Sequence, residues 1–180
     1  MRVIAGEFRS RKLTTLPGMA TRPTPDRLRE SLFNILAPRI EGTTFMDVYA
    51  GTGAVGIEAL SRGAARAIFI EKNRAAVEVI RENLHALDIE QRAEVFTAKA
   101  HTVLERLTAD IVFLDPPYDL EREYCESLDL LAQHENPLVI AQHSSRLALA
   151  TDYGALHRAR VVKQGDNSLS FFEQSTIPEL

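Results

Sequence analysis

The stretch "DVYAGTGAVGIEAL", residues 47–60, decides how this chain folds. It carries Gly51, Gly53 and Gly56 in the spacing G-x-G-x-x-G, between the apolar run "TFMDVY" and a helical apolar pattern. A glycine-rich turn between a strand and a helix lets the backbone bend sharply and approach a ligand closely. The stretch therefore predicts a βαβ unit with a ligand bound at its turn.

The rest of the chain continues this alternation of short apolar runs and helical segments. Strands are predicted at "AIFIE" (67–71), "EVFTA" (94–98), "DIVFLD" (110–115) and "LVIAQ" (138–142), and helices at 54–63, 74–87, 101–107 and 122–134. Such alternation indicates a parallel sheet. The last segment, "ARVVKQGDNSLSFFEQ", has two alternating runs around Gly165 and predicts an antiparallel hairpin that closes an edge of the sheet.

Length and composition limit the class of protein. The chain has 180 residues, 45% hydrophobic and 26% charged, so one soluble globular domain over 1–180 is expected. No apolar run approaches the roughly 18 residues that a membrane span needs. The N-terminus "MRVIAGEFRSRKL" lacks the apolar core of a signal peptide, and the single Cys125 excludes an internal disulfide. We therefore expect a cytoplasmic protein.

Charge is distributed unevenly along the chain. The net charge is −4, but residues 1–40 hold eight basic and three acidic side chains, a balance of +5. The remaining residues hold 13 basic and 22 acidic side chains, a balance of −9. A basic segment on an acidic chain indicates contact with a polyanion at that end.

Within this basic segment, two structures are predicted. "RVIAG" and "RKLTTL" form a small hairpin, and "TRPTPDRLRESLFNIL" forms a helix with Thr24 as its N-cap and Pro25 at its first position. Leucines and an isoleucine mark the buried face of the helix. Arg22, Arg27 and Arg29 are expected together on the other, exposed face.

Two acidic residues distinguish between possible ligands of the glycine turn. Glu71 ends the next strand, twenty residues after Gly51, where a carboxylate can accept hydrogen bonds from ribose hydroxyls. Asp47 precedes Gly51 by four residues. Its charge would be unfavourable beside a pyrophosphate and favourable beside the α-ammonium of S-adenosylmethionine. The pair therefore favours a methyl donor over NAD.

The segment "DPPY", residues 115–118, follows another buried strand and has the groups that an amine methylation needs. An exocyclic amine on a nucleobase is a poor nucleophile because its lone pair is delocalised into the ring. Acceptors for its N–H bonds, the Asp115 carboxylate and the Pro116 carbonyl, would favour a tetrahedral nitrogen. Pro116 and Pro117 stiffen the turn, and Tyr118 can stack on the base, worth about 1–3 kcal/mol.

These motifs together resemble a known family. "DPPY" with "DVYAGTGAVGIEALSRGA" is similar to class I S-adenosylmethionine-dependent amino-methyltransferases. "RVIAGEFRSRKL", "TRPTPDRLRESLFNIL" and "GDNSLSFFE" narrow the resemblance to the bacterial RsmD family, which methylates N2 of guanine 966 in 16S ribosomal RNA. The resemblance implies an α/β, Rossmann-like fold with a mostly parallel sheet, an antiparallel C-terminal hairpin and a small N-terminal hairpin and helix extension.

The resemblance also implies roles for individual residues. Donor contacts are assigned to Asp47, Ala50, Gly51, Thr52, Gly53, Gly56, Glu71, Lys72, Ala100 and His101, and the catalytic turn to Asp115, Pro116, Pro117 and Tyr118. RNA contacts are assigned, within the extension 1–40, to Arg9, Arg11, Lys12, Arg22 and Arg27. The implied cofactor is S-adenosyl-L-methionine and the implied partner is 16S rRNA in the assembling small ribosomal subunit. We expect a monomer. We expect no metal site, because one cysteine and scattered histidines match no ligand spacing.

This chain departs from the family pattern at two places. The region "FTAKAHTVL" lacks the acid that often lies near the adenine, so backbone contacts around Ala100 and His101 would have to serve. Gln164 stands where a tyrosine is more usual, which leaves part of the substrate pocket undefined.

Three other functions remain open. DNA adenine-N6 or cytosine-N4 methyltransferases use the same turn, but they usually carry a further recognition domain for which 180 residues leave little room. A noncatalytic RNA-binding protein with a vestigial donor pocket is less consistent with an intact Asp115, Tyr118 and glycine turn. An NAD-dependent oxidoreductase would need a hydride-relay group, and no histidine of the chain lies in a redox motif.

Overall fold

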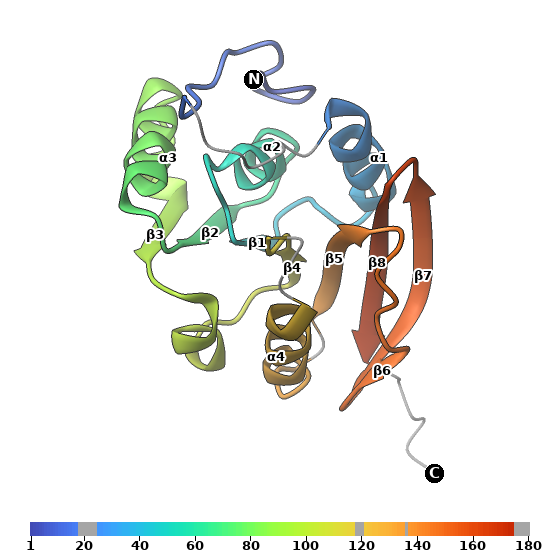
Figure 1. Ribbon diagram of the computed structural model, residues 1–180. Helices are drawn as coiled ribbons and strands as arrows, with labels where there is room; N and C mark the ends of the chain where they lie inside the picture. Colours follow the sequence, from blue (N-terminus) through green and yellow to red (C-terminus); the bar gives the residue numbers. More distant parts are fainter. Residues whose placement is uncertain (18–24, 118–120, 136, 175–180) are drawn as a thin grey trace.

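The computed structural model describes residues 1–17, 25–117, 121–135 and 137–174. Within these ranges, eight strands form one sheet in the order β3-β2-β1-β4-β5-β8-β7-β6 (Figure 1). The strands are β1 (Thr44–Val48), β2 (Arg66–Glu71), β3 (Ala93–Thr97), β4 (Ile111–Leu114), β5 (Leu138–Ser144), β6 (Asp152–Tyr153), β7 (Leu156–Gln164) and β8 (Asn167–Gln174). The helices are α1 (Asp26–Leu36), α2 (Ala54–Ser61), α3 (Arg74–Ala86) and α4 (Glu121–Leu131), with short 3-10 turns η1 (Glu90–Arg92), η2 (Ala100–Thr102) and η3 (Leu104–Arg106).

The directions of the strands confirm the predicted α/β fold. The pairs β1–β2, β1–β4, β2–β3 and β4–β5 are parallel. β8 pairs antiparallel with both β5 and β7, and β7 and β8 form the predicted hairpin around Gly165, whose φ is +60°. The hairpin does not itself end the sheet, because the two-residue strand β6, which the sequence did not predict, pairs with β7 at the edge.

Helices cover both faces of the sheet, which explains why the parallel strands are apolar runs. α1, α2, α3 and the N-terminal segment lie on one face, and α4 with η2 and η3 lies on the other (Figure 1). Every residue of β4 is buried, as expected for a strand packed on both sides. None of the described helices is long and apolar enough to cross a bilayer.

Most helix predictions agree with the structure within two residues, with three local differences. The helix predicted over 122–134 ends three residues earlier, at Leu131. The predicted helix over 101–107 is instead the pair of 3-10 turns η2 and η3. α1 begins at Asp26 with Pro25 at the N-cap position, where no side chain caps the helix, so Pro25 lies one position earlier than expected. Thr24 falls outside the described residues.

The N-terminal hairpin is present as a single antiparallel bridge between Arg2 and Lys12. Polar contacts with α2 hold it in place. The Glu58 carboxylate accepts from the Ile4 and Ala5 amides at 2.8 and 3.0 Å, and the Ser61 hydroxyl donates to the Ala5 carbonyl at 2.6 Å. The hairpin is therefore bound to the helix that follows the glycine turn.

The expected position of Arg29 is wrong. Its side chain is fully buried between α1 and α2 instead of joining an exposed basic face. Its Nε lies 3.9 Å from Oε2 of the buried Glu58, and its Nη2 donates to the Arg2 carbonyl at 2.7 Å and to Asp26 at 3.0 Å. Burial lowers the pKa of Arg29, while Glu58 and Asp26 favour its charged form. Arg29 therefore pairs with a carboxylate inside the protein rather than facing a polyanion.

Candidate active site

Three strand ends lie side by side at the centre of the candidate site. The pairing of β1 with β2 and β4 places Glu71, Tyr49 and Asp115 at the same level of the sheet, one at the carboxyl end of each strand. Since neighbouring strands lie about 4.8 Å apart, the backbones of Glu71 and Asp115 are about 10 Å apart, with the glycine turn between them. The carboxyl ends of parallel strands are where doubly wound sheets bind ligands.

The glycine turn leaves open space beside the backbone. Gly51 has a φ of +56°, a conformation that side chains disfavour, and a Cβ atom built on it would meet nothing within 4 Å. The Gly51 amide donates to Oε2 of Glu71 at 2.9 Å, which fixes the turn against the end of β2. A ligand can therefore approach the backbone at Gly51 while lying beside the Glu71 carboxylate.

Gly56 packs against the sheet, and its assigned donor contact stays a prediction. It is buried, and a Cβ atom there would lie 2.3 Å from the ring of Phe69 on β2. Its amide donates to Oδ2 of Asp47 at 2.9 Å. Gly56 thus permits α2 to pack closely against the sheet, as the third glycine of this motif commonly does.

Asp47 lies deeper than the sequence indicated, with only 2% of its surface exposed. Burial raises its pKa well above the usual value, the hydrogen bond from Gly56 opposes this, and the charges of Asp115 and Glu71 raise the pKa further. Three acidic groups therefore converge at the ends of β1, β2 and β4. Such an arrangement favours a positively charged ligand, which would stabilise their ionised forms.

S-adenosylmethionine fits this arrangement, since its sulfonium and ammonium are both cationic and its ribose has two hydroxyl donors. The open backbone at Gly51 and the acceptor oxygens of Glu71 match those parts of the molecule. Ala50 and Thr52 are half-buried beside Gly51, and Gly53 is buried.

The residues assigned to the adenine end lie at the ends of β2 and β3. The Ala98 amide donates to the Glu71 carbonyl at 3.1 Å, so the end of β3 lies alongside Glu71. Lys72 is exposed directly after Glu71, and η2 holds a buried Ala100 and an exposed His101. The adenine contacts of these residues stay predictions.

The proposed catalytic turn begins beside the glycine turn. Asp115 is half-buried and its amide lies 3.4 Å from the Val48 carbonyl of β1. Pro116 is buried and Pro117 is exposed. Tyr118 falls outside the described residues, so its stacking role stays a prediction.

Tyr49 is a feature of the site that the sequence did not reveal. It has a φ of +65°, an unusual and strained conformation for a tyrosine, between Asp47 and the glycine turn. Its hydroxyl shares a 3.0 Å hydrogen bond with the hydroxyl of Ser127 on α4, and burial raises its pKa above the ordinary value. Tyr49 thus fastens the end of β1 to the helix that follows the catalytic turn.

The basic residues assigned to RNA fall on two elements. Arg9, Arg11 and Lys12 are exposed on the N-terminal hairpin, where Nη2 of Arg11 donates to the Ala86 carbonyl of α3 at 3.0 Å. Arg27 is exposed on α1, and Arg22 falls outside the described residues. Among the described residues, no hydrogen bond or ion pair joins these side chains to the glycine turn or to Asp115.

The described part of the chain contains no group of three or more His, Cys, Asp or Glu side chains that could hold a metal ion. His143, the buried histidine, hydrogen-bonds to the Ser144 carbonyl and the Ser170 hydroxyl, both at 2.8 Å, and burial lowers its pKa. It has the contacts of a structural residue.

Comparison with known proteins identifies the family. A family model described as "Conserved hypothetical protein 95" matches residues 1–173. An Escherichia coli K12 protein named "Ribosomal RNA small subunit methyltransferase D" is 43% identical over 120 residues, which are 66% of this chain and 60% of that protein. The chain belongs to the RsmD family.

Other comparisons extend the RsmD assignment over nearly the whole chain. The Bacillus subtilis protein YlbH is 33% identical over 183 residues, with 97% of this chain and 99% of that protein covered. The solved structure of the Escherichia coli protein yhhF is 32% identical, with a TM-score of 0.86 and 97% of each chain covered. This RsmD chain thus has the fold of S-adenosylmethionine-dependent methyltransferases from the N-terminal hairpin to β8.

Proposed function

We propose that this chain transfers a methyl group from S-adenosylmethionine to the exocyclic N2 amine of guanine 966 in 16S ribosomal RNA. The observation that carries the proposal is the position of Asp115 beside the glycine turn, one strand away from Asp47 and two from Glu71. The name of the Escherichia coli relative, a ribosomal RNA small subunit methyltransferase, supports the choice of substrate.

In this proposal the donor lies across the ends of β1 and β2. Glu71 would accept hydrogen bonds from the ribose, Asp47 would lie towards the methionine end, and the backbone at Gly51 would pass close to the donor. Bound there, S-adenosylmethionine supplies a methyl group whose bond to sulfur breaks as its bond to the amine nitrogen forms. The acidic groups around the site favour the cationic donor over its neutral product.

The residues after β4 would act on the amine. The Asp115 carboxylate and the Pro116 carbonyl would accept hydrogen bonds from the two N–H groups of the amine. The nitrogen then becomes more tetrahedral, and its lone pair points at the methyl group. Asp115 then receives the proton that the methylated nitrogen loses. A strong base is not required, because the N–H becomes acidic only as the new bond forms. Tyr118 would stack on the guanine ring.

The RNA would lie against the basic N-terminal segment. Arg9, Arg11 and Lys12 on the hairpin and Arg27 on α1 would contact its phosphates, since phosphate contacts position a nucleic acid without reading its sequence. The proposal includes a monomer, without metal, that acts in the cytoplasm on 16S rRNA within the assembling small subunit.

Methylation of defined substrates tests this function. The protein would be incubated with S-adenosylmethionine and one of three substrates from cells that lack the gene: small ribosomal particles, naked 16S rRNA or duplex DNA. The methylated nucleoside would then be mapped by mass spectrometry. N2-methylguanine at a single rRNA position is expected. Methylated adenine or cytosine in the duplex would instead favour a DNA methyltransferase. Absence of donor binding in calorimetry would favour a noncatalytic RNA-binding protein.

A further inference from the structure

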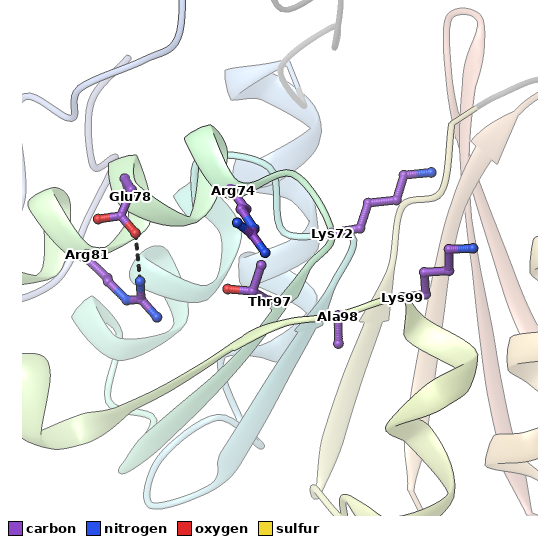
Figure 2. Close-up of a pocket in the computed structure, with 7 residues that line it drawn as sticks. All are labelled: Lys72, Arg74, Glu78, Arg81, Thr97, Ala98 and Lys99. Atoms are coloured by element: carbon purple, nitrogen blue, oxygen red, sulfur yellow. Dashed lines mark hydrogen bonds and ion pairs between the residues drawn. The ribbon is translucent and has the colours of Figure 1, made fainter.

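A basic hollow lies at the outer edge of the sheet, next to the donor site. Its volume is about 620 Å³, and it is lined by Lys72, Arg74, Glu78, Arg81, Thr97, Ala98 and Lys99 (Figure 2). The side chains come from the end of β2, from one face of α3 and from the end of β3, the edge strand of the sheet. Lys72, assigned above to the adenine end of the donor, lines it, whereas Asp47, Gly51 and Asp115 do not.

The charge of this hollow is opposite to that of the whole chain. Four basic side chains and one acidic side chain give it a formal charge of +3, whereas the chain carries −4. Glu78 is paired with Arg81 at 2.7 Å, which leaves Lys72, Arg74 and Lys99. In the described part of the chain these three form no ion pair or side-chain hydrogen bond. Concave surfaces lined by charges of one sign concentrate ligands of the opposite sign.

The arrangement of these cations limits the ligand to an anion. Lys72 and Lys99 extend in the same direction from neighbouring strand ends, away from Arg74, which points towards Thr97 (Figure 2). The adenine of the donor is neutral and would leave these charges uncompensated if it filled the hollow. Successive phosphate groups of a nucleic-acid backbone would neutralise them, and the guanidinium of Arg74 and the hydroxyl of Thr97 are both suited to hold the oxygens of one phosphate.

The position of the hollow relative to Asp115 favours the RNA substrate as the source of the phosphate. β3 lies three strands from β4 in the sheet, a distance of about 14 Å at the usual strand spacing. A strand of RNA whose base reaches Asp115 therefore has phosphates of flanking nucleotides within reach of the hollow. Arg11 of the N-terminal hairpin contacts the opposite end of α3, at Ala86, so the hollow is separate from the basic hairpin.

We infer that the hollow between α3 and β3 is a second phosphate-binding surface for the RNA substrate, with Arg74 and Lys99 as its main contacts. This inference rests on the proposed function, because the ligand is the RNA that carries the target guanine. The surface holds the flanking backbone on the donor side of the site, while the N-terminal hairpin holds another part of the RNA.

The test compares two double variants with the same loss of charge. Arg74→Gln/Lys99→Gln removes the two main contacts. Arg160→Gln/Lys163→Gln removes two exposed charges on β7, near the opposite edge of the sheet. RNA affinity is measured for both variants and for the wild type between about 50 and 200 mM salt. Calorimetry with S-adenosylmethionine verifies that each variant keeps the donor affinity of the wild type.

We expect the hollow variant to bind RNA more weakly than the wild type, and the β7 variant to bind like the wild type. Loss of two phosphate contacts makes the slope of log affinity against log salt concentration less steep by about 1.4. The ratio of wild-type affinity to variant affinity should therefore fall about sevenfold between the lowest and the highest salt concentration. The KM for RNA should rise while kcat changes little. Equal slopes for all three proteins, with active methylation by the wild type, would refute the phosphate surface and leave the proposed function intact.

A second measurement separates RNA phosphate from a free anion. Inorganic pyrophosphate is titrated into the wild type and into the hollow variant by calorimetry. Pyrophosphate binding that is lost in the variant, together with an unchanged RNA salt slope, would assign the hollow to a small anion and overturn the inference. A wild type that neither binds nor methylates RNA would refute the proposed function and the phosphate surface together.

Discussion

Asn83 of α3 joins the glycine turn to the N-terminal segment through its buried carboxamide. Its Nδ2 donates to the Thr52 carbonyl at 3.2 Å and to the Thr14 carbonyl at 3.1 Å, and its Oδ1 accepts from the Thr14 amide at 2.7 Å. Only 2% of its surface is exposed. One side chain thus holds both the turn that would bind the donor and the segment that carries the proposed RNA contacts.

Replacement of Asn83 should therefore weaken donor binding as well as stability. Asn83→Leu leaves the Thr52 carbonyl and both Thr14 groups without this partner. Thr14 is exposed and Thr52 is half-buried, so water can replace part of these contacts, and each lost hydrogen bond should cost about 1 kcal/mol. We expect a lower Tm and a higher Kd for S-adenosylmethionine, measured by calorimetry below the Tm. Asn34→Leu, on the exposed face of α1, is the matched control and should change neither value. A normal donor Kd in Asn83→Leu would show that the turn keeps its shape without this contact.

Asp115→Ala tests the chemical step separately from donor binding. The carboxylate is proposed to contact the target amine and not the donor, so kcat should fall by about 10²–10³ or more while the donor Kd stays within a few-fold. Single-turnover methylation of small-subunit particles measures the first value, and calorimetry the second. Turnover close to that of the wild type would remove Asp115 from the mechanism.

Asp47→Asn should bind the donor more weakly than the wild type does. It should also be more stable than the wild type, by an amount that depends on pH. The folded state raises the pKa of this carboxyl, so it binds the proton more tightly than the unfolded state does. The contribution of Asp47 to the free energy of unfolding is therefore fully present below the pKa that its carboxyl has in the unfolded state. This contribution is lost as the pH rises through the pKa that the carboxyl has in the folded state. The amide carries no charge, so the Tm advantage of the variant should grow with pH.

Thermal unfolding of wild type and Asp47→Asn from acidic to alkaline pH measures this effect. In a chain of this size, each kcal/mol gained corresponds to a rise in Tm of about 2–4 °C. A Tm difference that stays constant across the series would contradict the electrostatic explanation. The Kd for S-adenosylmethionine should rise in the same variant, because a positive ligand loses one of its neighbouring charges.

The buried pair of Arg29 and Glu58 predicts an unequal effect of removing its members. Glu58 also accepts from Arg62 at 2.8 Å and from two amides of the N-terminal hairpin, so it keeps partners when Arg29 is lost. Among the residues that the structure describes, Arg29 keeps Asp26 and the Arg2 carbonyl when Glu58 is lost. Glu58→Leu should therefore reduce the free energy of unfolding by more than Arg29→Met, with the larger loss about 3–5 kcal/mol. Urea denaturation at neutral pH decides the order, and equal losses would contradict it.

The sequence predicted best what depends on local pattern. β4 was predicted as "DIVFLD" because a strand covered on both faces must be apolar throughout, and the glycine spacing identified the turn after β1. The carboxyl ends of β1, β2 and β4 then had to lie together, since parallel neighbours share one edge. Asp47, Glu71 and Asp115, each at or near one of these ends, therefore lie close together in the structure.

What the sequence did not predict depends on contacts between distant segments. Arg29 has the appearance of an exposed arginine until Glu58, twenty-nine residues later, is known to be buried beside it. Tyr49 has a φ of +65°, which no residue preference would indicate for a tyrosine. Asn83 acts through Thr14 and Thr52, which no sequence periodicity connects to it. Arg29 and Asn83 are buried and Tyr49 is half-buried, and each has a polar partner on another element.

The order of strands has a consequence for how the protein forms during translation. β8 follows β7 in the chain, yet it lies between β5 and β7 in the sheet, and Phe172 pairs with Val139 in the core beneath α4. Until β8 leaves the ribosome, one side of β5 has unpaired backbone groups and the hydrophobic surface around Val139 remains uncovered. A nascent chain in this state would be prone to aggregation and a natural client for chaperones.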